Sequence, residues 1–225
     1  MDDVTPAGTF VRSMATRGHQ GGLALAVPGA VRVLDAAGFS TVVIETVGVG
    51  QVEVDVVAAA DTAVVITTPG TGDAVQANKA GLLEVADLFV VNKADRPGAD
   101  DARRDLELML DLARMTGADT DEAGNRFRPD IIMAIATSGE GASAIASAID
   151  AHLEHLRVSG NLEPRRAQRV TAEIRSRAEQ VVLGRLTTLI AGPEAQAMMR
   201  ASIADDSSPV SAAESIVELL TGEIK

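Results

Sequence analysis

The stretch LFVVNKAD, residues 88–95, decides the fold of this chain. It consists of the apolar run Leu88–Val91 and the polar tetrapeptide Asn92–Asp95, and Asp87 precedes it. Three similar runs lie at 41–45 (TVVIE), 62–68 (TAVVITT) and 130–136 (DIIMAIA). Contiguous rather than alternating apolar residues are typical of parallel strands that are buried on both faces. We therefore predict strands at 41–45, 62–68, 87–92 and 130–136, with the tetrapeptide following one of them.

Helical stretches separate these strands, and they lie at 28–37, 73–85, 100–115 and 141–157. Strands that alternate with helices of this length predict βαβ crossovers. The expected fold class is α/β, with a mostly parallel sheet flanked by helices. A short extended run at 10–14 is a candidate for an additional strand.

The carboxyl-terminal part of the chain has a different character. It reads as one long helix at 165–189, a Gly-Pro break, and two shorter helices at 194–203 and 209–220. The sequence thus predicts an α/β domain over 1–158 and a helical extension over 159–225. A surface extension and a dimerisation arm both fit this pattern, because helices with so little tertiary support are marginal in water.

Composition excludes several classes of protein. The net charge of −12 disfavours binding to nucleic acid and to anionic membranes. The chain has no cysteine, which excludes disulfides and thiolate metal sites. No apolar run approaches the roughly 20 residues needed to span a bilayer, and no signal peptide is evident. We expect a soluble cytoplasmic protein.

Asn92-Lys93-Ala94-Asp95 is the strongest chemical signal. An N-K-x-D motif at the carboxyl end of a strand is how GTPases recognise guanine. The Asp95 carboxylate can accept hydrogen bonds from the guanine N1–H and exocyclic amine, whereas adenine would leave that charge unpaired. The Lys93 stem would lie over the base, and Asn92 would tie neighbouring loops together. The alternative interpretation is a polar loop with a helix cap.

A second motif, ETVGVGQ at 45–51, directly follows a predicted strand. A carboxylate in this place, Glu45, would order Mg²⁺ or its waters, and Gly48 would let a backbone N–H approach a γ-phosphate. Gln51 is placed to orient a catalytic water, although an ordinary solvated glutamine fits as well. Glu45 and Gln51 are therefore the catalytic candidates, with GTP or GDP and Mg²⁺ as the expected ligands.

Two weaker signals follow in chain order. Thr137 and Ser138 lie in ATSGEG (136–141), where GTPases place a small loop whose backbone N–H contacts the guanine O6. The Gly-rich stretch from residue 69 to 79 enters a predicted helix and could respond to nucleotide. A tight turn capped by Asp73 explains that stretch equally well. His152 and His155 read as ordinary surface histidines.

The phosphate-binding motif G-x-x-x-x-G-K-[S/T] occurs nowhere in the 225 residues. The segment 18–23 (GHQGGL) lacks the lysine and the hydroxyl and cannot replace it. Without that loop the β- and γ-phosphates lose a nest of N–H groups, and Mg²⁺ loses a hydroxyl ligand.

Taken together, these stretches resemble the MeaB/ArgK family of P-loop GTPases, which are associated with methylmalonyl-CoA mutase and were once called LAO/AO transport system kinases. The matching stretches are FVRSMATRGHQGGL (10–23), AAGFSTVVIETVGVGQVEVDV (36–56), PGTGDAVQANKAGLLEVADLFVVNKAD (69–95) and, more loosely, HLEHLRVSGNLEPRRAQ (152–168).

The resemblance implies roles for particular residues and for the whole protein. Glu45 would hold Mg²⁺ through a bound water, and Gly48 would contact the γ-phosphate. Asn92, Lys93 and Asp95 would read guanine with support from Thr137 and Ser138. The family's extra switch would carry Gly72, Asp73, Gln76 and Lys79. The implied protein is a homodimeric GTPase chaperone that gates adenosylcobalamin delivery to methylmalonyl-CoA mutase and protects that enzyme.

The chain departs from the family pattern because the phosphate-loop strand and helix are absent, so the sheet is expected to be incomplete. A start codon assigned too late is the favoured explanation; a true truncation and a partner chain that supplies the missing half are the alternatives. The alternative function is a non-catalytic remnant that dimerises or docks on the mutase. A nickel-insertion GTPase is disfavoured by the absence of cysteine, and a kinase role rests on the older family name alone.

Overall fold

The computed structural model describes residues 8–14, 26–46, 59–70, 86–116, 127–205 and 208–221, and the structural statements below concern these residues. The chain divides into two compact units, residues 1–169 and residues 170–225. The predicted helix at 73–85 lies outside the described residues.

The first unit contains a parallel sheet of three strands in the order β1-β2-β3. The strands are β1 (Val64–Thr67), β2 (Leu88–Asn92) and β3 (Asp130–Ala134). Val65 pairs with Phe89, and Asn92 pairs with Ala134. Four of the five residues of β2 are buried, as the contiguous apolar run predicted for a central strand. Three of the predicted strands are therefore confirmed.

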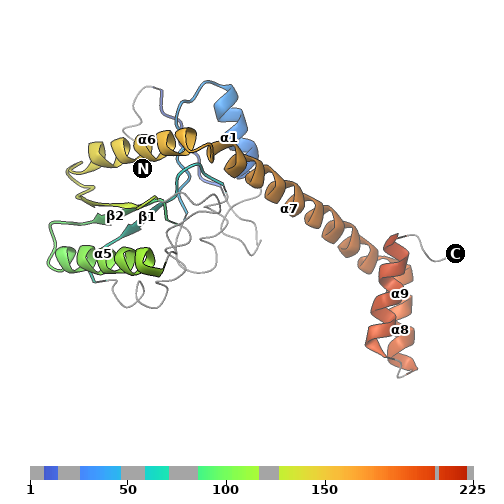
Figure 1. Cartoon of the computed structure of the whole chain (residues 1–225). Helices are drawn as coiled ribbons and strands as arrows, with labels where there is room; N and C mark the ends of the chain where they lie inside the picture. Colours follow the sequence, from blue (N-terminus) through green and yellow to red (C-terminus); the bar gives the residue numbers. More distant parts are fainter. Residues whose placement is uncertain are drawn as a thin grey trace. The chain divides into compact units, whose positions relative to one another are not determined.

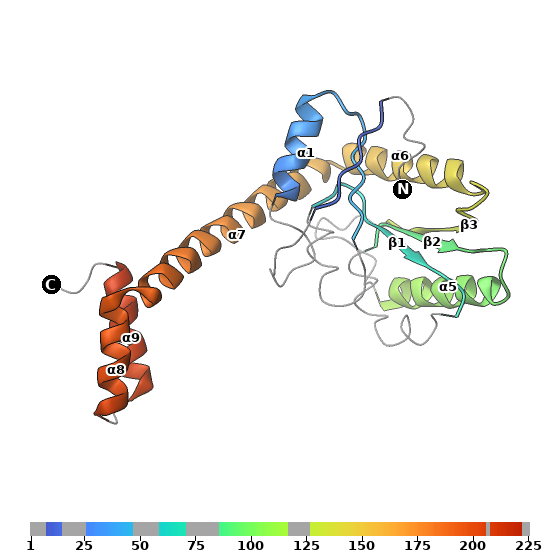
Figure 2. The same cartoon turned by 180° about the vertical axis from the view of Figure 1, so that it is seen from behind.

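Helices cover both faces of the sheet. Helix α5 (Ala99–Thr116) lies on one face and α6 (Ala142–Val158) on the other (Figures 1 and 2). The core forms where Phe89 and Val91 of β2 meet the buried side chains of α5, which are Ala99, Leu106, Met109 and Leu110. These positions recur at helical spacing, so one stripe of α5 faces the sheet. Because the three strands are parallel, their carboxyl ends lie at the same edge of the sheet, and the loops that follow them start there.

The predicted strand at 41–45 is wrong in this structure. Residues 41–46 follow helix α1 (Val27–Ala36) without forming a strand, and residues 10–14 form none either. A strand exists only where a neighbour supplies ladder hydrogen bonds. Within the described residues, the sheet ends at β1 and no strand pairs with 41–46. Val43 is accordingly 85% exposed rather than buried.

Three helices complete the chain, and all three were predicted. They are α7 (Leu162–Ala191), α8 (Pro193–Ala204) and α9 (Pro209–Thr221). Helix α7 begins three residues before its predicted start, since Pro164 is tolerated in a first helical turn. No helix of the described chain is long and apolar enough to cross a membrane.

The second unit has a sparse core. Ala195 of α8 and Ile216 of α9 are its buried apolar residues among those described. A mainly apolar cavity of about 700 Å³ lies among the end of α7, α8 and α9, and its lining includes Leu186, Met199 and Ile203. The division into a GTPase domain at 1–158 and a dimerisation extension at 159–225 stays a prediction.

Candidate functional site

The side chain of Asn92 joins the loops that follow β2 and β3. Its Oδ1 accepts hydrogen bonds from the backbone N–H of Lys93 at 2.8 Å and of Ala136 at 3.1 Å. The N–H of Ala94 donates to the carbonyl oxygen of Ala134 at 3.0 Å. The Asn92 loop (residues 92–95) is thereby fixed to the β3 turn (residues 135–141), and the two candidate base-binding segments lie side by side.

Lys93 has an unusual backbone conformation. Its φ of 58° is the one positive φ at a described non-glycine residue. A lysine in this region costs about 1–2 kcal/mol, so the surrounding contacts of the loop must hold it there. Lys93 and Asp95 are both exposed, which leaves their side chains accessible to a ligand. Backbone strain of this kind is common where a loop is shaped for binding.

The β3 turn uses the Ser138 hydroxyl to hold its own shape. Ser138 Oγ donates to the carbonyl oxygen of Ile135 at 3.1 Å and accepts from the N–H of Glu140 at 3.3 Å. Ile135 and Glu140 also form an isolated antiparallel bridge. The Ser138 side chain is thus committed within the turn, while Thr137 is exposed beside it.

Gly141 is a residue of this site that the sequence reasoning did not single out. It has a φ of 84°, and a Cβ on it would lie 2.5 Å from the carbonyl oxygen of Met133 and 2.9 Å from the Cα of Ala134. The backbone at the start of α6 therefore packs directly against the end of β3. A glycine closing a G-x-G triplet before a helix was the available signal.

Of the other predicted site residues, the structure describes Glu45, and it does not lie in this cluster. Glu45 is exposed at the end of segment 41–46, and no described contact joins it to the Asn92 loop. Gly48 and Gln51 lie outside the described residues, as do the predicted switch residues Gly72, Asp73, Gln76 and Lys79. The described residues contain no group of three or more histidines or carboxylates that could hold a metal.

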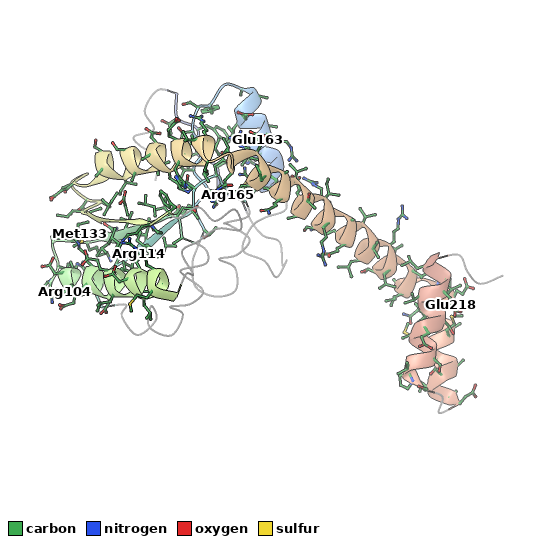
Figure 3. All side chains as sticks on the ribbon, in the orientation of Figure 1. Arg104, Arg114, Met133, Glu163, Arg165 and Glu218 are labelled. Atoms are coloured by element: carbon green, nitrogen blue, oxygen red, sulfur yellow. The ribbon has the colours of Figure 1, made fainter. Side chains whose placement is uncertain are left out.

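A second polar cluster lies at the amino ends of β1 and β2, and we call it the ionic junction (Asp61, Thr62, Asp87, His152, Arg165, Arg166 and Arg169). Arg165 holds Asp87 through two hydrogen bonds, Nη1 to Oδ1 at 3.0 Å and Nη2 to Oδ2 at 2.6 Å. Figure 3 labels Arg165 near the amino end of α7. Asp87 Oδ2 also accepts from the N–H of Ala63 at 2.8 Å.

Asp61 forms the other half of the junction. Its carboxylate accepts hydrogen bonds from Arg166 and from Arg169. The hydrogen bond from Arg166 is the main cause that lowers the pKa of Asp61 to about 2, against a burial that raises it. The same hydrogen bond raises the pKa of Arg166. The first turns of α7 are therefore bound to the segments that lead into β1 and β2.

The interpretation of His152 as a surface histidine is wrong. Its side chain is buried, with Nδ1 2.8 Å from Thr62 Oγ1 and Nε2 3.4 Å from Asp87 Oδ1. The ring also stacks at a tilt on Phe127, with the centroids 4.8 Å apart. Burial lowers the pKa of His152, although the charge of Asp87 raises it. A lone histidine in an amphipathic helix gives no sequence signal for this environment.

Comparison with known proteins relates the chain to a family of GTPases. A model of the family described as "Methylmalonyl Co-A mutase-associated GTPase MeaB" matches residues 1–190. A protein of Pyrococcus abyssi described as a GTPase is 43% identical over 218 residues, which are 97% of this chain and 66% of that protein. The chain thus spans just under two thirds of that relative's length.

Two further matches concern a mutase and a solved structure. A fused isobutyryl-CoA mutase of Paraburkholderia xenovorans is 35% identical over 136 residues, which are 57% of this chain and 11% of that protein. The crystal structure of a LAO/AO transport system kinase superposes with a TM-score of 0.57 at 25% identity, covering 86% of this chain and 61% of that one. The α/β fold of this chain is therefore that of a P-loop GTPase.

Proposed function

This chain belongs to the MeaB family of methylmalonyl-CoA mutase-associated GTPases, and on that premise we propose that it binds guanine nucleotide through the Asn92 loop and the β3 turn. The observation that carries the proposal is the Asn92 side chain, whose oxygen holds Lys93 and Ala136 in place. A base-binding pocket needs both segments fixed before the ligand arrives, because their ordering would otherwise reduce the affinity.

Guanine selection would come from Asp95. Its exposed carboxylate can accept from the N1–H and the exocyclic amine of guanine, and both hydrogen bonds are charge-assisted. Adenine has no donor pair in that arrangement, so it would leave a desolvated carboxylate unpaired. The aliphatic stem of Lys93, whose backbone is left-handed, would cover one face of the base.

We further propose that the whole protein hydrolyses GTP. A single exposed carboxylate, Glu45, suits Mg²⁺, which keeps several of its waters and takes few protein ligands beside the phosphates. The ion would neutralise charge on the phosphates when bound. Gly48 and Gln51 are the proposed γ-phosphate and water-orienting residues. The predicted switch, Gly72 to Lys79, would respond to the nucleotide state.

The test for guanine recognition measures binding of fluorescent GDP and ADP to the purified chain with Mg²⁺. We expect GDP to bind and ADP not to bind. An Asp95→Asn variant should lose about 1.5–3 kcal/mol of GDP binding, which is roughly tenfold to a hundredfold in Kd. The same variant should gain affinity for xanthosine diphosphate, because the asparagine amide can donate to the carbonyl that replaces the exocyclic amine. Equal binding of GDP and ADP by the wild-type chain would contradict the proposal.

A second candidate function for the 225 residues, which contain no phosphate-binding motif, is that of a non-catalytic module that dimerises or docks on the mutase. Single-turnover hydrolysis of GTP separates the two functions. Release of phosphate above the rate of an Asp95→Asn control supports the enzyme. GDP binding without phosphate release supports the module.

The proposed partner is a methylmalonyl-CoA mutase, which the chain would protect and supply with adenosylcobalamin as a homodimeric chaperone. Two findings support it: the family description names that mutase, and a fused isobutyryl-CoA mutase carries a related segment. Co-purification of the chain with a mutase should depend on whether GDP or GTP is present. Binding that is absent with either nucleotide would count against this partner.

A further inference from the structure

At each end of strand β2 a side-chain oxygen accepts a hydrogen bond from a neighbouring segment of backbone. The contact at the amino end, made by Asp87, is the basis of the inference. At the carboxyl end, Asn92 Oδ1 accepts the N–H of Ala136 from the segment after β3. At the amino end, Asp87 Oδ2 accepts the N–H of Ala63 from the segment before β1. We propose that the Asp87–Arg165 pair is a remote positioning element for the Asn92 loop, an inference that rests on the proposed guanine site.

The geometry of the pair is that of a strong, specific contact. The two parallel hydrogen bonds from Arg165 to Asp87 fix the carboxylate in both position and rotation. The side chains are 25% and 15% exposed, so solvent screens the pair only partly. Asp87 N–H and Leu88 N–H both donate to the carbonyl oxygen of Ala63, which places the carboxylate directly on the first rung of the β1–β2 ladder.

Arg165 reaches this carboxylate because the neighbouring contacts hold the start of α7. Arg166 and Arg169 bind Asp61, which lies two residues before Ala63. His152 of α6 lies 3.4 Å from the other oxygen of Asp87. Helices α6 and α7 therefore converge on one carboxylate, and that carboxylate sets the position of β2 relative to β1.

Strand β2 is suited to transmit a displacement from one end to the other. Asn92, its last residue, lies five residues after Asp87, so the two are roughly 17 Å apart. Leu88, Phe89, Val90 and Val91 are each 3% exposed or less and packed between two helix layers. A close-packed strand has no slack to absorb a shift of its first residue, so the shift reaches Asn92.

The experiment compares Arg165→Gln and Arg165→Lys with wild type and with Arg175→Gln. Arg175 is a matched control because it also lies on α7 and pairs with a carboxylate, Glu179, at 3.1 Å, but is 82% exposed. Two quantities are measured well below the melting temperature of each variant. They are the Kd for fluorescent GDP and the hydrogen-exchange rate of the Ala136 amide, which reports the Asn92 contact without any nucleotide.

We expect Arg165→Gln to weaken GDP binding on the order of tenfold and to speed Ala136 exchange by a similar factor. Arg165→Lys should lie between it and wild type, because a lysine cannot make both parallel hydrogen bonds. Arg175→Gln should match wild type in both quantities. A folded Arg165→Gln with wild-type values would overturn the proposal. If Arg165→Gln does not fold, wild-type values in Arg165→Lys would do so.

The two readouts also separate this inference from the proposed function. If the wild-type chain binds no GDP, the guanine site is refuted, and Ala136 exchange still shows whether Arg165 positions the loop. If GDP binds but neither Arg165 variant changes its Kd or the exchange rate, the guanine site stands and the positioning role is refuted.

Discussion

Asn92 holds two backbone N–H groups on one side-chain oxygen, and this makes it the residue on which the candidate site depends most. In Asn92→Ala both N–H groups lose their partner. Because both contacts are solvent-exposed, water replaces part of the loss, and we expect a destabilisation of about 1 kcal/mol. The measurement is the urea midpoint. Asn92→Asp keeps an acceptor oxygen and should stay closer to wild type; equal losses in both variants would show that the acceptor is not what matters.

His152 leads to a prediction about pH. Its pKa is lowered by burial, so the unfolded chain binds more protons than the folded chain between that lowered pKa and the ordinary value of 6.5. Stability should therefore rise as the pH increases through this window, and fall when the solution is acidified through it. Urea midpoints at pH 5 and pH 7.5 would measure the slope.

The neighbouring residue His155 provides the control for this slope. His155→Gln retains His152 and should retain the slope in this window, whereas His152→Gln should flatten it. A wild-type chain that is equally stable at both pH values would contradict the assignment of a buried neutral imidazole. Besides burial, the charged groups that face His152 and influence its pKa are Asp87, Arg165, His155 and Asp61.

At the scale of elements, two glycines lie at the junction of β3 and α6, and they differ in the space available for a side chain. Gly139 and Gly141 both have positive φ, at 80° and 84°, but a Cβ on Gly139 would meet nothing within 4 Å. Gly139→Ala should cost about 1–2 kcal/mol from backbone strain alone. Gly141→Ala should cost clearly more, since its Cβ would press on the carbonyl oxygen of Met133. The free energy of unfolding is measured with denaturant. Equal losses of stability in the two variants would show that the turn shifts to make room for the added Cβ of Gly141→Ala.

The elements also show how far sequence reasoning reaches. β2 was predictable because a strand that is buried on both faces appears in the sequence as a contiguous apolar run. The N-K-x-D motif then marked its carboxyl end. Residues 41–45 carry the same kind of run, but whether they form a strand depends on a neighbour that local sequence does not contain. Asp87 and Arg165 are 78 residues apart in the chain, and the sequence around either residue does not predict that they pair. The roles of the predicted site residues stay predictions.

At the scale of the whole molecule, we expect self-association through the second unit, in line with the proposed homodimer. Its apolar cavity includes Ile203 and Val217, which are 82% and 48% exposed. A second copy that covers these side chains would bury them. Ile203→Asp should then weaken the dimer on the order of thirtyfold or more, measured by sedimentation or light scattering.

The control for the dimer is a substitution of the same kind in the first unit. Leu112 of α5 is 62% exposed, and Leu112→Asp should leave the association unchanged. A chain that is monomeric at high concentration, or a dimer that Leu112→Asp disrupts as strongly, would contradict the assignment of this cavity to the interface.

Phe127 lies between two imidazoles, with its ring centroid 4.8 Å from that of His152 and 4.9 Å from that of His155. The sequence has three histidines, four phenylalanines, and neither tryptophan nor tyrosine. The ring current of Phe127 should displace the imidazole proton resonances of both neighbours from their usual positions, in a spectral region with few other signals. Those resonances therefore report whether α6 and the segment before β3 keep their places when a nucleotide or a partner is added.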